Sequence, residues 1–200
     1  MEKMRVRLTF KEQVLGTASA DPELHSRFIA SKSPDAATIE DEVAALGAEA
    51  VEQKAMTVFP KEDGKPFIYD YQIKGFFKNA CKAMREVDKS ASSKLKAYKT
   101  KIDNLVFVDE RKILFENPNG GEIEIGNLQR PLRASTAQGE RIALANSESV
   151  PAGTEVEFTI TTLVPEMMAQ VQEWLDYGAL NGLGCWHNSG CGRFTWKDVS

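Results

Sequence analysis

The chain has 200 residues, of which 42% are hydrophobic and 27% charged, as expected for one globular domain that buries its own core. Its net charge of -4 at pH 7 excludes a bulk polycation such as a histone-like protein, but a local basic face remains possible. No apolar stretch is long enough for a membrane helix, and the first residues lack the apolar core of a secretory signal. With an odd number of cysteines, three, we expect a reduced, cytoplasmic setting.

The N-terminal segment alternates polar and apolar side chains from Arg5 to Phe10, which predicts a strand with one buried face. An acidic insertion is expected over residues 18–65. Within it, Thr38 is a candidate N-cap with Asp41 three residues later, and apolar residues at helical spacing follow, so the insertion is predicted to contain a helix.

A second helix is predicted to begin near Asp70. Its apolar side chains recur at helical spacing and form one face: Ile73, Phe76, Phe77, Ala80, Cys81 and Met84. Its basic side chains are spaced by four, four and three residues and form a second face: Lys74, Lys78, Lys82 and Arg85. The sequence therefore predicts an amphipathic helix with a buried side and a basic side.

The basic stripe continues into a Ser/Lys-rich segment, residues 89–101, which is predicted to be a mobile loop and carries Lys94, Lys96, Lys99 and Lys101. Residues 72–101 together hold nine basic and two acidic side chains, a net charge of +7. Such a block is either a solvated Lys-rich surface or the electrostatic footprint of a nucleic-acid backbone.

Short strands are predicted at 105–108 and 113–115, and Asn119-Gly120-Gly121 marks a turn. A hairpin is predicted to join 141–145 to 155–163 around Pro151. A helix is predicted from Pro165 to Gly178, with Met168, Val171, Trp174 and Leu175 facing the core, and a closing strand over 193–199. We therefore expect a single α+β domain, 1–200, with a ferredoxin-like (RRM-like) βαββαβ core, an inserted helical segment and extra β-hairpins.

A glycine-rich run precedes the last strand, and its glycines are Gly182, Gly184, Gly190 and Gly192. Glycines at this density allow positive φ angles and leave backbone N–H groups accessible, which suits either a phosphate or close packing against another backbone. Trp186 and His187 are expected at the tip of the run, where they either stack on a base or pack onto the neighbouring helix.

The run resembles the C-terminal glycine-rich motif of the CRISPR-associated RAMP superfamily. The segment from Phe67 through Lys74-Gly75 is similar to the family's short strand that leads into its first helix, and Ser147–Phe158 is similar to the strand before its second helix. The resemblance implies an RNA-binding, backbone-type subunit without catalytic activity, and a divergent, phage-encoded member of the family is the suspected form. It also implies a homo-oligomer or a place within a CRISPR-like complex.

On this interpretation the nucleic-acid contacts come from both basic segments and from the glycine-rich run. The predicted contacts are Lys74, Lys78, Lys82, Arg85, Lys94, Lys96, Lys99, Lys101, Gly182, Gly184, Trp186, His187, Gly190, Gly192 and Arg193, with Arg130 and Arg133 as secondary candidates. RNA is the expected ligand, and single-stranded DNA is the less favoured one.

Two other functions stay open. RAMP endoribonucleases that use a histidine place it roughly where His25 lies here, so His25 is a candidate general base for metal-independent RNA cleavage. Alternatively, a phage-encoded mimic of a backbone subunit would dock onto a CRISPR complex and act as an anti-CRISPR protein.

Neither a metal nor another cofactor is expected. Cys185, His187 and Cys191 provide only three local ligands at a spacing that matches no common zinc motif. Small cysteines between glycines in a tight loop account for the same pattern.

Overall fold

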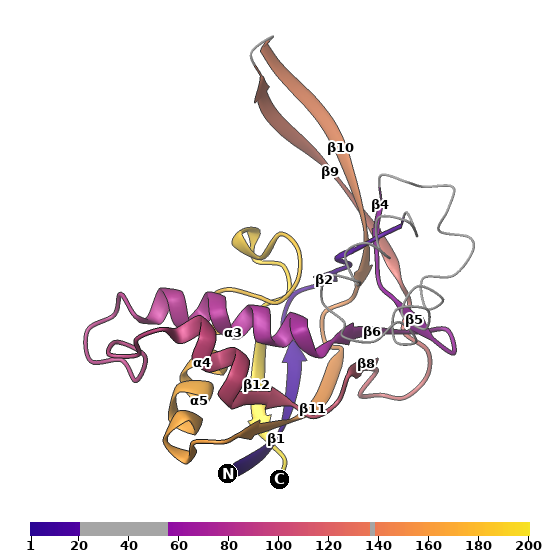
Figure 1. Cartoon of the computed structure of the whole chain (residues 1–200). Coiled ribbons are helices and arrows are strands. Elements are labelled where there is room, and N and C mark those ends of the chain that lie inside the picture. The colour runs from indigo at the N-terminus through magenta and orange to yellow at the C-terminus, as the bar shows by residue number, and fades with distance from the viewer. Residues whose placement is uncertain (21–55, 137–138) are drawn as a thin grey trace, which may run out of the picture.

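The computed structural model describes residues 1–20, 56–136 and 139–200, in an α+β arrangement (Figure 1). The helix predicted near Thr38 and the candidate base His25 lie outside these residues. No helix in the described ranges is both long enough and apolar enough to span a membrane.

The main sheet has the strand order β12-β1-β11-β8-β6-β5, and β7 also pairs with β11. All of these pairs are antiparallel. Strand β1 lies second from one edge of this sheet, with β11 on one side and the edge strand β12 on the other. The strands are β1 (Glu2–Phe10), β5 (Lys61–Glu62), β6 (Lys65–Tyr69), β7 (Val106–Val108), β8 (Lys112–Glu116), β11 (Glu155–Thr162) and β12 (Phe194–Asp198).

A smaller sheet has the order β2-β10-β4-β3, with β9 paired to β10. Its strands are β2 (Val14–Leu15), β3 (Ala18–Ser19), β4 (Met56–Val58), β9 (Gly126–Thr136) and β10 (Gly139–Val150). Strands β9 and β10 form a long antiparallel ribbon that extends away from the body of the molecule as an arm (Figure 1).

The helices are α3 (Asp70–Met84), α4 (Tyr98–Leu105) and α5 (Met168–Tyr177), and a short 3₁₀ turn, Pro165–Met167, leads into α5. The N-cap of α3 is Tyr69, whose backbone N–H donates to the side-chain oxygen of Gln72 at 2.7 Å. The helix therefore begins within one residue of the predicted N-cap, Asp70. Helix α5 ends at Gly178, also as predicted.

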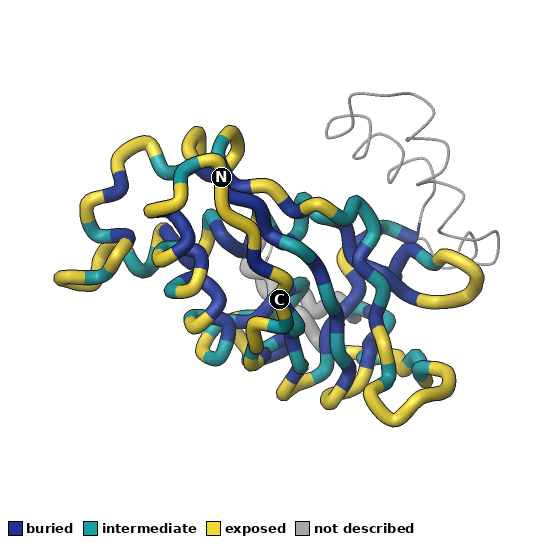
Figure 2. The backbone as a smooth tube through the Cα atoms, turned by 90° about the horizontal axis from the view of Figure 1, so that it is seen from below, coloured by how far each residue is buried: buried dark blue, intermediate teal, exposed yellow. Residues whose placement is uncertain are grey.

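The core lies between the helices and the main sheet (Figure 2). Strand β1 buries Met4, Val6, Leu8 and Phe10, as its alternation predicts. The predicted apolar faces of both helices are confirmed except at Met84, which is only half-buried. The buried residues are Ile73, Phe76, Phe77, Ala80 and Cys81 of α3 and Met168, Val171, Trp174 and Leu175 of α5. The interface is aromatic, with the rings of Phe77 and Trp174 5.6 Å apart.

The opposite face of the main sheet carries ion pairs. Arg5 and Arg7 of β1 both donate to Glu157 of β11, and Arg7 Nε lies 2.5 Å from the carboxylate. The hydrogen bond from Arg7 holds the pKa of Glu157 below its usual value. Lys3 pairs with Asp109 at 2.8 Å. The charges of this face therefore largely neutralise one another.

Two details differ from the sequence prediction. Strand β10 pairs with β9, β2 and β4, whereas β11 pairs within the main sheet, so the predicted hairpin between 141–145 and 155–163 is wrong. The predicted loop 89–101 also ends early, because residues from Tyr98 onward form α4. That helix buries only Ile102, which leaves little periodicity to detect in the sequence.

Candidate nucleic-acid interface

The glycine-rich loop runs from Gly182 to Arg193, between α5 and β12 (Figure 1). Its two ends close against each other, since the N–H of Leu183 donates to the carbonyl of Gly192 at 3.0 Å. The N–H of Gly192 in turn donates to the carbonyl of Gln13 at 2.8 Å, which joins the loop to the segment after β1. The loop is therefore a closed structure fixed to the sheet.

Close backbone approach explains two of the four glycines. A Cβ at Gly182 would overlap the carbonyl oxygen of Cys191, and a Cβ at Gly192 would overlap that of Leu183. Gly192 also has a φ of +71°, a conformation that L side chains rarely adopt. Of the two roles predicted for these glycines, the structure provides direct support for backbone packing at Gly182 and Gly192.

The crest of the loop carries a run of backbone donors without an acceptor among the described residues. Within the described residues, the N–H groups from Gly184 through Asn188 donate to no backbone or side-chain acceptor. Trp186, in the middle of the run, has a φ of +58°, and Gly184 has a φ of +91°. Successive free N–H groups around left-handed residues form a partial positive charge that suits an anion.

Trp186 connects this crest to the arm. The guanidinium of Arg130 in β9 lies 4.5 Å from the centre of the Trp186 ring, a cation–π contact. The indole is still 39% exposed. One side of the ring is thus supported by the root of the arm, while exposed surface remains for a stacked base. The side chain of Arg133, further along β9, lies outside what the structure describes.

His187 is held by the loop itself. Its Nδ1 lies 3.1 Å from the carbonyl oxygen of Gly184. Because a carbonyl only accepts, Nδ1 carries the proton, and in the neutral ring Nε2 is left as an acceptor. Arg193 closes the other end of the loop, where its Nε donates to the carbonyl of Gly190 at 3.3 Å and its Nη2 to Glu12 at 3.2 Å.

The two cysteines of the loop are protonated thiols rather than thiolates. Burial raises the pKa of Cys185 and of Cys191, and the nearby charge of Arg130 opposes that shift only in part. In the part of the chain that the structure describes, no group of three or more His, Cys, Asp or Glu side chains is arranged to hold a metal ion.

The basic residues of α3 do not share one free surface. Lys74 donates to the backbone carbonyl of Asp103 in α4 at 3.0 Å, and Lys78 pairs with the carboxylate of the same residue at 2.6 Å. Burial lowers the pKa of Lys74, whose ammonium also lies 5.0 Å from the ring of Phe107. Arg85 lies over the ring of Tyr98 at 5.2 Å. Helix α4 thus covers much of the face that the sequence predicts to be basic and open.

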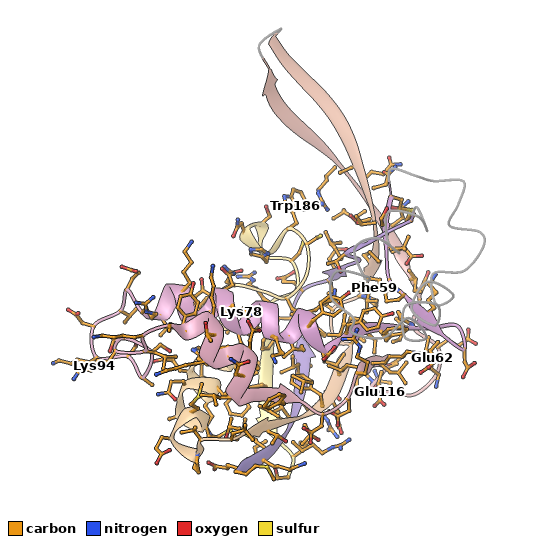
Figure 3. All side chains as sticks on the ribbon, viewed as in Figure 1. Phe59, Glu62, Lys78, Lys94, Glu116 and Trp186 are labelled. Carbon is orange, nitrogen blue, oxygen red and sulfur yellow. The ribbon has the colours of Figure 1, made fainter. Side chains whose placement is uncertain are left out.

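The accessible positive charge lies at the C-terminal end of α3 and beyond it. Five of the predicted contacts there are exposed and form no ion pair or hydrogen bond with other described residues: Lys82, Lys94, Lys96, Lys99 and Lys101. Figure 3 shows Lys94 at one end of the molecule and Trp186 near the root of the arm, with Lys78 between them. The predicted contacts therefore divide into two groups, the glycine-rich loop and the lysine-bearing end.

The lysine-bearing loop is anchored to α5. Glu173 accepts hydrogen bonds from the backbone N–H of Ala91 at 2.7 Å and from both the N–H and the hydroxyl of Ser92. Ser92 is fully buried, and its hydroxyl oxygen accepts from the indole N–H of Trp174 at 2.8 Å. The sequence contains no clear signal for this network, because it joins residues that are about eighty positions apart.

Glu173→Ala is expected to lower the free energy of unfolding by about 2–3 kcal/mol, since it leaves the buried donors of Ser92 without their charged acceptor. Urea denaturation measures the change. Glu166→Ala, at an exposed position just before α5, is the control and is expected to change the value by less than about 0.5 kcal/mol. Equal effects of the two substitutions would show that Glu173 does not anchor the loop.

No protein-family model matches this chain, and no curated protein matches it in sequence. Among solved structures it is similar to a chain of the Type IV-B CRISPR complex, with a TM-score of 0.53 and 12% identity, over 100% of this chain and 91% of that one. It is also similar to a chain of the Type III-B Cmr-beta complex bound to cognate target RNA, with a TM-score of 0.54 and 10% identity. At these identities the likeness shows a shared fold.

The second match covers all of this chain but only 60% of the Cmr-beta chain. This protein thus spans less than two thirds of that relative.

Proposed function

We propose that this chain is an RNA-binding member of the RAMP superfamily, a non-catalytic subunit of a CRISPR-type ribonucleoprotein complex. The strand order β12-β1-β11-β8, with α3 between β1 and β8 in the chain and α5 between β11 and β12, supports a ferredoxin-like βαββαβ core. The fold is shared with chains of two CRISPR complexes, one of them bound to RNA. Assembly on RNA with further copies or other subunits is part of the same proposal.

The observation that carries the RNA assignment is the crest of the glycine-rich loop. Its N–H groups from Gly184 to Asn188 suit a phosphate, and the exposed indole of Trp186 beside them suits a base. A nucleic-acid strand offers both groups in each repeat. The exposed lysines of the lysine-bearing end add long-range electrostatic attraction for the phosphate backbone of the RNA.

The open face of the main sheet is a less suitable RNA surface. RNA-binding sheets of the RRM type stack bases on exposed aromatic side chains. Here the corresponding positions of β1 and β11 carry Arg5, Arg7, Glu155 and Glu157 in ion pairs. We therefore place the RNA on the side of α3 and the glycine-rich loop.

The test is a salt titration of RNA binding. The chain is expected to bind a labelled single-stranded RNA at low salt and to lose roughly 300-fold in affinity between about 50 and 200 mM salt, if about six phosphates are contacted. Fluorescence anisotropy measures both affinities, and the same RNA on a denaturing gel is expected to stay intact. A chain that binds no RNA at low salt, or binds it independently of salt, contradicts the proposal and favours the interaction-protein alternative.

A further inference from the structure

A cavity of about 520 Å³ opens beside the glycine-rich loop. Three segments line it: residues 17–19 between β2 and the end of β3, the first half of α3, and the start of the glycine-rich loop as far as His187. The size is in the range of pockets that hold small organic ligands. The cavity lies on the α3 side of the loop, next to the crest that carries the free N–H groups.

The inner walls of the cavity are apolar. Phe76, Leu183 and Ala18 line it and are themselves nearly buried. Gln72 is part of the wall and is already engaged, since its oxygen accepts from Tyr69 and its amide nitrogen donates to Thr17. These hydrogen bonds tie the start of α3 to the β2–β3 segment, so the cavity is preformed.

The rim of the cavity carries side chains that can form hydrogen bonds with a ligand. The amide of Asn79 is exposed and has no hydrogen-bond partner among the described residues. His187 also lines the cavity, and its Nε2 is an acceptor once Nδ1 donates to Gly184. Apolar walls with a donor and acceptors at the mouth suit a flat heterocycle with polar edges.

We propose that this cavity holds one base of the bound RNA, turned out of the strand while its phosphate lies on the crest of the glycine-rich loop. The inference rests on the proposed function. An anion site and an apolar pocket with a polar rim lie side by side and share His187, and a nucleotide is the ligand that combines a phosphate with such a heterocycle. On this proposal the glycine-rich loop binds a nucleotide in addition to packing against the sheet.

Gly75 provides a clean way to fill the cavity. It is an exposed position of α3 that lines the cavity, and a Cβ placed there would meet no atom within 4 Å. Gly75→Phe is therefore chosen to place a ring at the cavity wall, because its Cβ displaces no neighbour. Gly75→Ala is the matched control because it keeps the cavity open. Both substitutions replace a helical glycine, so both variants are expected to melt at or above the wild-type temperature.

The experiment measures the affinity of three proteins for each of two strands. Wild type, Gly75→Ala and Gly75→Phe are titrated with RNA of random sequence, roughly ten nucleotides long, and with an abasic ribose-phosphate strand of the same length. Wild type and Gly75→Ala are expected to prefer the base-bearing strand. Gly75→Phe is expected to bind that strand about tenfold more weakly and to bind the abasic strand unchanged, because one stacked base contributes on that order.

The outcomes separate the two proposals. If Gly75→Phe binds both strands as Gly75→Ala does, with the same salt dependence, the base is not in the cavity, while the RNA-binding proposal stands. If Gly75→Phe loses affinity equally for both strands, the substitution blocks the backbone, and the base-pocket inference is wrong. If the wild type binds neither strand, both proposals fail together.

Discussion

Gly192→Ala is expected to destabilise the fold by about 3 kcal/mol or more, the largest single effect that we predict for a one-methyl change. The added Cβ would overlap the carbonyl of Leu183, and the residue would keep a φ of +71°. Strain in the left-handed region and overpacking each cost about 1–3 kcal/mol. The hydrogen bonds from Leu183 to Gly192 and from Gly192 to Gln13 would be disturbed as well. Urea or thermal unfolding measures the loss.

Gly120→Ala separates the two contributions to this loss. Gly120 has a φ of +77°, close to that of Gly192, but a Cβ there would meet no atom within 4 Å. Its substitution is expected to cost only the left-handed strain, about 1 kcal/mol. A loss at Gly192 no larger than the one at Gly120 would mean that the two ends of the loop separate easily, and the closed loop described above would be wrong.

Removing the exposed lysines of the lysine-bearing end is expected to have the largest effect on RNA binding. Replacement of Lys94, Lys96, Lys99 and Lys101 by alanine would remove four exposed cations that pair with no described residue. Affinity for single-stranded RNA is expected to fall roughly a hundredfold at about 50 mM salt. The slope of log affinity against log salt is expected to fall by about 3, since each phosphate contact on a single strand contributes about 0.7.

The paired lysines of α3 are the control for this experiment. Lys74→Met together with Lys78→Met removes two cations that are already engaged by Asp103. The salt slope is expected to change little, although both residues are predicted contacts on sequence grounds alone. A fall in slope as large as that of the fourfold variant would show that α4 leaves this face of α3 open to RNA.

The helices were the most predictable part of the fold. Helices α3 and α5 bury the side chains that their apolar spacing indicates, because an amphipathic helix of three or more turns leaves a strong periodic pattern. Helix α4 escapes the same reasoning, since it buries only Ile102. Because α4 was not predicted, Lys74 and Lys78 were expected to be free for RNA, whereas both contact Asp103 of α4.

Strand pairing was less predictable than the strands themselves. The segments that form β1, β7, β8, β11 and β12 are visible as short apolar or alternating runs. The partner of each is set by tertiary packing, so proximity in sequence wrongly suggested that β10 pairs with β11. For the same reason the contact between Arg130 and Trp186, and the cavity beside α3, have no counterpart in any local pattern.

The position of β1 has a consequence for the order in which the molecule assembles. Its sheet partners are residues 155–162 and 194–198, so Val6 and Leu8 have no strand to pair with until nearly the whole chain is available. Pairings between such distant segments form slowly, and the unpaired strand is exposed to aggregation in the meantime. A nascent chain of this protein therefore depends on late pairing of its first strand, and a ribosome-associated holding factor that covers β1 is expected to improve its yield.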